Sequence, residues 1–480
     1  MEFTHTTTDE KHLPLTPIIH PWIREVVSNQ SLLEEAVSEF QSPLNIQSLV
    51  PFEENVNAFK SVFDKYELQH RIYFARKANK CISYTTHAAE LGEGVDTASF
   101  EELAQCLEAG INPAQLISTA AVKTQRLMEL AVDNGVTIII DNLDELDLLE
   151  KVTERSGKQA HISLRVGGFD MNGATLHSRF GFSIAAAQQL VLEKLIKHPT
   201  LLYTGLHFHL NGYSIPERAV AIGQCIALVD ALKAHQIDTL HLDIGGGYLV
   251  NYLSDKAEWN TFQSELKRAV LRKRPELTYR NDPLGIVKIE NTLYGEAKVY
   301  PYYSEVHKAG FLENILTSAV SGYDAPIHQL LRDRRIEIRI EPGRSLLDQA
   351  GITVARVAFR KHDSAGNLLV GLEMNRTQMK SSSADFLLDP IHLSTAPSSE
   401  SDLLEESKPV FGYLVGAYCL EQEFILLRKI KFHHLPSVGD LIVFVNTAGY
   451  MMHFFESQAH QFALAENVFY NKDKSLRVDK

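Results

Sequence analysis

Residues 72–79 read "IYFARKAN", an alternating apolar stretch that predicts a buried strand and ends at Arg76 and Lys77. From here, short β-branched runs such as "VTIIID" (136–141) and "AHISLRV" (160–166) alternate with helical stretches along the chain. Alternation of this kind predicts parallel strands joined by helical crossovers. At least six such strands within about 280 residues favour a (β/α)8 barrel of the TIM type over a short open sheet.

The sequence pattern changes after Gly351, where strand-like runs such as "ITVARVAFRKH" (352–362) follow one another without helices between them. We therefore expect an α/β protein with a barrel and a β-rich C-terminal domain of sandwich or barrel type. The expected boundaries are a leader with a short helix at 1–40, the barrel at 41–350 and the β domain at 351–480. An insertion is expected at about 251–330, and a first strand near 41–50 joins either the barrel or the β domain.

Composition and charge exclude several classes of protein. The 480 residues include 47 basic and 60 acidic side chains, and the net charge of -13 repels nucleic acid and anionic lipid. No run of about 18 uncharged apolar residues predicts a membrane span. The four cysteines are scattered and no signal peptide precedes them, which predicts reduced thiols in a cytoplasmic protein.

Chemically versatile side chains fall at the ends of the expected strands, where a barrel of this type builds its active site. They are Lys77, Arg165, His209 and Glu341. A lysine at a strand end projects into the mouth of the barrel, where its amine can form a Schiff base with a carbonyl compound. Taken singly, such a lysine more often reaches for solvent.

Two further runs carry residue types that suit an anionic ligand. The run "LDIGGGY" (242–248) places Gly245, Gly246 and Gly247 after an apolar strand, where bare backbone N–H groups can close on a phosphate or simply form a tight turn. The run "RIEPGRS" (339–345) brings Glu341 and Arg344 close together, either to hold one ligand or to form a surface ion pair.

Two histidines, His207 and His209, alternate on one face of the run "LHFHLNG" (206–212). They lack a third ligand at a familiar spacing, so no metal site is predicted there. His209 is interpreted either as a flat ring packed against a ligand or as a core histidine.

Together these runs resemble, in order and spacing, the pyridoxal-phosphate-dependent decarboxylases of the alanine-racemase-like barrel class, known as fold type III. This group holds the diaminopimelate, ornithine and arginine decarboxylases. The resemblance extends over roughly residues 40–455. It implies pyridoxal 5'-phosphate as cofactor, an amino acid as small-molecule substrate, decarboxylation as the reaction, and a homodimer with shared active sites.

The resemblance also implies roles for individual residues. Lys77 would bind the cofactor aldehyde, His209 would stack on the cofactor ring, and Glu341 would keep the pyridine nitrogen protonated, which makes the ring an electron sink. Cys419, in "GAYCLEQE", resembles the cysteine that the neighbouring subunit supplies as a general acid. The further cofactor contacts implied are Asp96, Arg165, Ser214, Gly245, Gly246, Gly247, Gly343, Arg344 and Tyr450.

The chain departs from the family at the residues expected to meet the substrate. Leu420 stands where the family has an acidic residue, and Asp389-Pro390 stands where diaminopimelate decarboxylases carry an arginine-proline pair that grips the distal carboxylate. A carboxylate buried without its guanidinium would cost several kcal/mol, so we expect an atypical substrate. Candidate substrate residues are Glu421, Glu423, Arg376 and Asp389.

Two alternatives remain open at this stage. An amino-acid racemase on the same scaffold would share the carbanion chemistry and break a different bond. A cofactor-binding homologue without turnover is suggested by Leu420 and by Asn211, which replaces a small residue of the family motif. The atypical pocket residues favour a specialised biosynthetic role.

Overall fold

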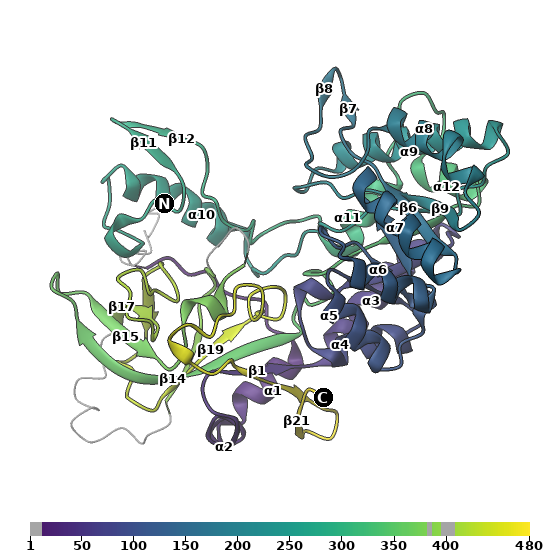
Figure 1. Ribbon diagram of the computed structural model, residues 1–480. Coiled ribbons are helices and arrows are strands. Elements are labelled where there is room, and N and C mark those ends of the chain that lie inside the picture. Colours follow the sequence, from purple (N-terminus) through teal and green to yellow (C-terminus); the bar gives the residue numbers. More distant parts are fainter. Residues whose placement is uncertain (1–11, 382–385, 395–408) are drawn as a thin grey trace. The chain divides into compact units, whose positions relative to one another are not determined.

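The computed structural model describes residues 12–381, 386–394 and 409–480, and Figure 1 shows its helices and strands. The chain divides into two compact units. The first, here called the barrel unit, comprises Phe52–Leu249 and Val306–Leu346. The second, the β unit, comprises the described residues up to Pro51 together with Val250–Glu305 and Leu347–Asp479.

Eight parallel strands close into a barrel in the order β10, β13, β2, β3, β4, β5, β6, β9. This confirms the predicted (β/α)8 barrel. Most of the strands are rich in apolar residues, because a parallel strand inside a ring of helices is buried on both faces. Their bounds are β2 His70–Ala75, β3 Gly94–Thr97, β4 Leu116–Ser118, β5 Thr137–Ile140, β6 Ala160–Arg165, β9 Leu201–His207, β10 His241–Asp243 and β13 Glu337–Ile340.

Helices follow the strands, and five of them begin at a residue whose side chain caps the helix. Each of five N-cap side chains accepts a hydrogen bond from a backbone N–H of the first turn, and these residues are Ser99, Thr124, Asn142, Ser183 and Ser214. The helices of this unit are α4 Ile82–Glu90, α5 Phe100–Glu108, α6 Gln125–Asn134, α7 Leu143–Ser156, α8 Ile184–Glu193, α9 Ile215–Ala234, α11 Lys308–Leu316 and α12 Ile327–Asp333. A further helix, α3 (Leu49–Lys65), begins in the β unit and continues into the barrel unit.

The β unit contains a nine-stranded mixed sheet, which confirms the β-rich second domain. Its path runs β18, β17, β15, β14, β1, β20, β21, and β19 pairs with both β14 and β16. The earliest strand, β1, lies between β14 and β20, with Leu44 opposite Val354 and Glu466. The bounds are β1 Leu44–Gln47, β14 Gly351–His362, β15 Leu368–Leu372, β16 Ile391–Leu393, β17 Val410–Val415, β18 Ile430–Phe432, β19 Leu441–Val445, β20 Glu466–Tyr470 and β21 Leu476–Val478.

Two N-terminal helices, α1 (Pro21–Ser28) and α2 (Gln30–Phe40), contribute to the core of the β unit. Trp22 of α1 and Val37 of α2 pack in one cluster with Ile46 of β1 and Val443 of β19. The indole N–H of Trp22 donates to the Gln349 carbonyl oxygen at 2.8 Å, so its polar group is satisfied inside the core.

Residues 250–305 pack with the β unit, although they lie between two barrel strands in sequence. They carry α10 (Lys256–Val270) and the hairpin of β11 (Val287–Ile289) and β12 (Thr292–Tyr294). The Tyr279 N–H donates to the Leu427 carbonyl oxygen at 2.8 Å, which joins this stretch to the C-terminal sequence. The stretch predicted as an insertion, 251–330, therefore spans parts of both units, because α11 belongs to the barrel unit.

Acid is expected to destabilise the protein through buried neutral histidines such as His241, whose ring lies 2.6 Å from the Ser163 hydroxyl. Burial, and then Arg339, lower the pKa of His241 well below its usual value. The unfolded chain therefore binds a proton below about pH 6.5 that the folded chain does not, and the free energy of unfolding falls as pH drops, by up to about 1.4 kcal/mol per pH unit for each such histidine. Urea unfolding between pH 7 and pH 5 should show this slope, and H241Q should flatten it. Equal slopes in both proteins would contradict the assignment.

Candidate active site

The predicted cofactor residues of the barrel unit lie at the carboxyl ends of its strands. Lys77 is on the short helical turn after β2, His209 is two residues beyond β9, and Glu341 directly follows β13. Asp96 lies within β3 and Arg165 ends β6. Because the strands are parallel, all these ends meet at the same rim of the barrel.

Lys77 forms an ion pair with Asp96, with its Nζ 3.0 Å from Oδ2. The Asp96 side chain is 1% exposed and also accepts from the Thr119 hydroxyl at 2.5 Å, whereas the Lys77 side chain is 36% exposed. Burial raises the pKa of Asp96, and Lys77 opposes this effect. The carboxylate therefore holds an accessible amine in place at the mouth of the barrel.

A buried group of three side chains lies beside this amine. Nε2 of His207 is 3.0 Å from Oε1 of Glu341, and both side chains are at most 3% exposed. Burial, and then Arg165, lower the pKa of His207 well below its usual value, so the neutral ring donates to Glu341. Asp243 accepts from the Gly245 N–H at 2.8 Å through one oxygen, and its other oxygen has no hydrogen-bond partner among the described residues.

The pKa of Asp243 is raised well above its usual value, first by burial and then by Glu341. Two carboxyl groups this close inside the barrel cannot both ionise at low cost. The buried site therefore favours the neutral form of Asp243, while Glu341 accepts the hydrogen bond of His207.

His209 holds the glycine run in place. Its Nδ1 accepts from the Gly246 N–H at 3.2 Å, and burial followed by Lys77 lowers the pKa of His209 to about 3. The ring is therefore neutral near pH 7. At Gly246 a Cβ would lie 2.6 Å from the Glu341 carbonyl oxygen, and Gly245 and Gly247 adopt φ of 68° and 86°. These conformations and contacts exclude larger residues, which explains the three glycines.

Arg218 of α9 supports the same glycine run, and the sequence analysis did not identify it. Its buried guanidinium donates to the carbonyl oxygens of Gly212 at 2.9 Å and of Gly246 and Gly247 at 3.2 Å each. Arg218 thus fixes the carbonyl groups of this loop, while the Gly245 and Gly246 N–H groups donate to Asp243 and His209. The sequence signal was an arginine in the first turn of the helix that follows His209.

A second network fixes Arg165. Its Nε lies 3.7 Å from Asp141, and its guanidinium lies over the Phe180 ring at 4.0 Å. Asp141 also accepts from the Gly181 N–H at 3.0 Å, which ties the "SRFG" loop (178–181) to the same rim. Arg165 is therefore oriented by elements that follow two different strands.

Three predicted phosphate contacts lie in loops of the barrel unit. Ser214 caps α9, and its hydroxyl accepts from the Glu217 N–H at 3.3 Å. Gly343 is buried and Arg344 is half-buried in the loop after β13. Their positions after strands β9 and β13 place them on the same rim as Lys77 and His209.

The remaining predicted residues belong to the β unit. Tyr450 lies in the turn after β19, and Cys419 is an exposed free thiol after β17. Arg376 and Glu421 line a cavity of about 550 Å³ within this unit. The buried Glu423 accepts from the Arg376 backbone N–H at 2.8 Å, so three of the four candidate substrate residues gather there.

Asp389 lies apart from that cavity lining and has internal partners. It pairs with Arg428, lies 3.1 Å from the His12 ring and accepts from the Leu15 N–H at 3.0 Å. Although burial opposes the effect, Arg428 and then His12 hold the pKa of Asp389 well below its usual value. Its carboxylate therefore stabilises the β unit, and a guanidinium for a distal carboxylate is missing at this position.

These features fit pyridoxal phosphate. A Cβ at any of Gly245–Gly247 would clash with atoms packed against the run, so only glycine fits at this part of the rim, while the accessible Lys77 amine suits an aldehyde. Glu341, which accepts from the buried His207 ring, suits a protonated pyridine nitrogen. A closed barrel with this set of side chains at its mouth defines a pyridoxal-phosphate-dependent enzyme of fold type III.

Residues 49–282, just under half of the chain, match the family described as pyridoxal-dependent decarboxylase, pyridoxal binding domain. This match and the curated relatives support a pyridoxal-phosphate-dependent amino-acid decarboxylase. It is 29% identical over 451 residues to the uncharacterised protein y4yA of Sinorhizobium fredii, covering 93% of this chain and 92% of that one. It is 27% identical to diaminopimelate decarboxylase of Neisseria meningitidis, covering 70% of each chain.

Solved structures confirm the fold. Diaminopimelate decarboxylase from Helicobacter pylori, complexed with L-lysine, matches with a TM-score of 0.66 and 19% identity over 93% of this chain and 96% of that one. Lysine decarboxylase from Selenomonas ruminantium matches with a TM-score of 0.65 and 17% identity over 92% and 96%. Within the described residues, no helix is long and apolar enough to cross a membrane.

Proposed function

We propose that Lys77 is the residue that binds the aldehyde of pyridoxal phosphate, and that decarboxylation takes place in the mouth of the barrel. The observation that carries this is the Lys77 amine, 3.0 Å from a buried carboxylate on the rim that also bears His209 and Glu341. When bound, the cofactor supplies an electron sink for the electrons left at Cα after loss of CO2.

The other residues bind and orient. The glycine run Gly245–Gly247, with Ser214, Gly343, Arg344 and Tyr450, holds the phosphate. The neutral ring of His209 packs on the cofactor, and Arg165 and Asp96 set the position of the Lys77 amine. Glu341 would accept a hydrogen bond from the pyridine nitrogen of the cofactor. Support comes from the strand-end positions of the barrel residues and from Arg218, which fixes the glycine run.

The enzyme works as a homodimer in which Cys419 of one subunit donates a proton at Cα in the active site of the other. Its thiol is exposed in a loop beside Leu420, which is 49% exposed, so this loop of the described chain is available to a second copy. A thiol is suited to this general-acid step. All four cysteines are free, which supports a reducing, cytoplasmic location.

Mixed dimers test the shared site. K77A and C419A chains, each of low activity alone, should recover about one quarter of wild-type CO2 release when unfolded together and refolded, because half of the dimers are mixed and each has one intact site. Wild-type chains carried through the same refolding provide the reference. Absence of recovery, with mixed dimers demonstrated by tagged chains, would show that Lys77 and Cys419 do not act across subunits.

The substrate is an α-amino acid whose side chain lacks a free distal carboxylate. Asp389 stands where diaminopimelate decarboxylases carry the arginine for that group, and its carboxylate is engaged by Arg428. Arg376 and Glu421, which line the β-unit cavity, are the residues proposed to meet the substrate side chain. Basic and diamino acids, such as lysine, ornithine and arginine, are therefore favoured over diaminopimelate.

Trapping CO2 from the holoenzyme with a panel of L-amino acids tests the proposal, with chiral analysis of the amino acid that remains. Release of CO2 from a basic amino acid, and little from diaminopimelate, is the expected result. Inversion at Cα without CO2 would identify a racemase. A yellow holoenzyme whose spectrum responds to no amino acid would identify a cofactor-binding homologue without turnover.

A further inference from the structure

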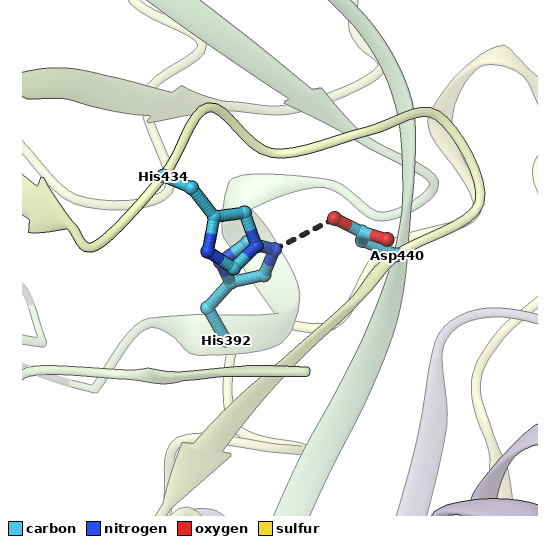
Figure 2. A group of neighbouring side chains, drawn as sticks. All are labelled: His392, His434 and Asp440. Carbon is cyan, nitrogen blue, oxygen red and sulfur yellow. Dashed lines mark hydrogen bonds and ion pairs between the residues drawn. The ribbon is translucent and has the colours of Figure 1, made fainter. Parts of the chain in front are cut away.

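A second cluster of metal-ligating side chains lies in the β unit, outside the cofactor site. His392 is the middle residue of β16, His434 follows β18, and Asp440 immediately precedes β19. One ring nitrogen of each histidine and one carboxylate oxygen all lie within 4.8 Å of one another. Figure 2 shows the two imidazoles lying one over the other, with the Asp440 carboxylate facing the His392 ring.

The cluster is held together before any ligand binds. Nε2 of His392 is 2.7 Å from Oδ2 of Asp440, and the two histidine ring centroids are 4.7 Å apart. Asp440 is completely buried and also accepts from the Ser437 N–H at 2.8 Å, which fixes its direction. The Phe432 ring meets His392 edge-on at 5.9 Å. The donors therefore sit on a rigid base beside an apolar wall.

The donor set is the kind that divalent zinc prefers. Two imidazole nitrogens and one carboxylate oxygen give three of four tetrahedral ligands, and water can take the fourth position. In a tetrahedral zinc site, neighbouring donor atoms are about 3.3 Å apart. The distances between the ligand atoms of His392, His434 and Asp440 run from 2.7 Å to at most 4.8 Å, on both sides of that value. Small side-chain movements would complete the site.

We propose that His392, His434 and Asp440 bind a zinc ion that is independent of pyridoxal phosphate. The ion replaces the proton shared between His392 and Asp440 and ties β16 to the segment 434–440. β16 pairs only three residues with β19 in the described sheet, from Ile391 opposite Val443 to Leu393 opposite Leu441, so a metal link at its centre adds a constraint to a short strand. The role is structural, and thermal stability is the property that it changes.

The barrel unit contains another group with metal-ligating atoms, formed by His207, Asp243 and Glu341. That group belongs to the cofactor site, where Glu341 is assigned to the pyridine nitrogen. Its three residues are buried, whereas His392 and His434 are half-buried and open to an ion from solution. A substitution at one of the β-unit ligands therefore shows which of the two groups binds the metal, because it leaves the barrel group unchanged.

The experiment is zinc titration of holoenzyme that has been treated with chelator, followed by mass-spectrometric measurement of metal per chain and by thermal melting. Wild type should retain one zinc per chain after gel filtration, and its melting temperature should rise with zinc concentration. H434Q should weaken zinc binding at least about 100-fold, since loss of an outer partner of a ligand already costs about 10–100-fold.

His433 provides the matched control because it is the adjacent histidine and is exposed. H433Q should bind zinc as tightly as wild type, and the cofactor colour should be unchanged in both variants. H434Q leaves the His392–Asp440 hydrogen bond intact, so it should fold. Wild type without bound zinc, or H434Q with undiminished zinc affinity, would overturn the proposal.

Discussion

K77A is expected to reduce CO2 release by at least about 1,000-fold and to abolish the covalent attachment of pyridoxal phosphate. The amine that the substitution removes lies 3.0 Å from Asp96, and the alanine leaves that buried carboxylate without its cation. The phosphate cradle at Gly245–Gly247 is untouched, so the cofactor should still bind weakly. Borohydride reduction followed by peptide mass spectrometry measures the attachment directly.

Lys80 supplies the control, since it is an exposed lysine three residues further along the same loop. K80A should keep both the adduct on Lys77 and the activity. A pyridoxyl group found on a lysine other than Lys77 in the wild-type protein would refute the assignment. An adduct on Lys77 without CO2 release from any amino acid would instead separate cofactor binding from the proposed reaction.

The barrel could be predicted because most of its strands are rich in apolar residues and five of its helices begin at a capping side chain, and both signals are local. The pairing of β1, in contrast, has no local signal in the sequence. Leu44–Gln47 lies between β14 and β20, strands more than 300 residues away, and nothing local indicates such a neighbour. Residues 250–305 likewise join the β unit through contacts such as that of Tyr279 with Leu427.

The active-site residues also divide into those that the sequence could identify and those that only the fold reveals. Lys77, His209, the glycine run and Glu341 could be found because strand ends in a barrel converge on one rim. The supporting residues were missed, since Arg218 acts through three carbonyl groups and Asp243 through its nearness to Glu341. His207 was visible in the sequence as the partner of His209 on one strand face, but only the fold shows that it faces Glu341.

The roles of the proposed substrate residues could not be predicted from the sequence, because they depend on which partners each side chain has in the fold. Asp389 was a candidate because it replaces an arginine of the family pattern. In the structure its carboxylate is occupied by Arg428, His12 and the Leu15 N–H, all from the β unit. A sequence cannot show that an acidic residue has already found its counterion 39 residues further along the chain.

E341Q is expected to lower CO2 release about 100–1,000-fold while the cofactor stays bound, because an amide cannot replace the charge that stabilises a protonated pyridine nitrogen. His207 and Asp243 lie beside Glu341, and their contacts lead us to expect that the loss of CO2 release is specific to this one carboxyl group. His207 donates to Glu341 at 3.0 Å, and burial together with Glu341 raises the pKa of Asp243 well above its usual value. Turnover with a saturating amino acid, and the visible spectrum of the holoenzyme, are the measurements.

D243N is the informative comparison, since an amide resembles a protonated carboxyl in shape and charge. If Glu341 alone carries the negative charge, D243N should cost less than about tenfold, well below the loss in E341Q. Equal losses in the two variants would mean that the charge is shared between both carboxyl groups. In that case His207 would serve both of them, and H207Q should then be as damaging as either substitution.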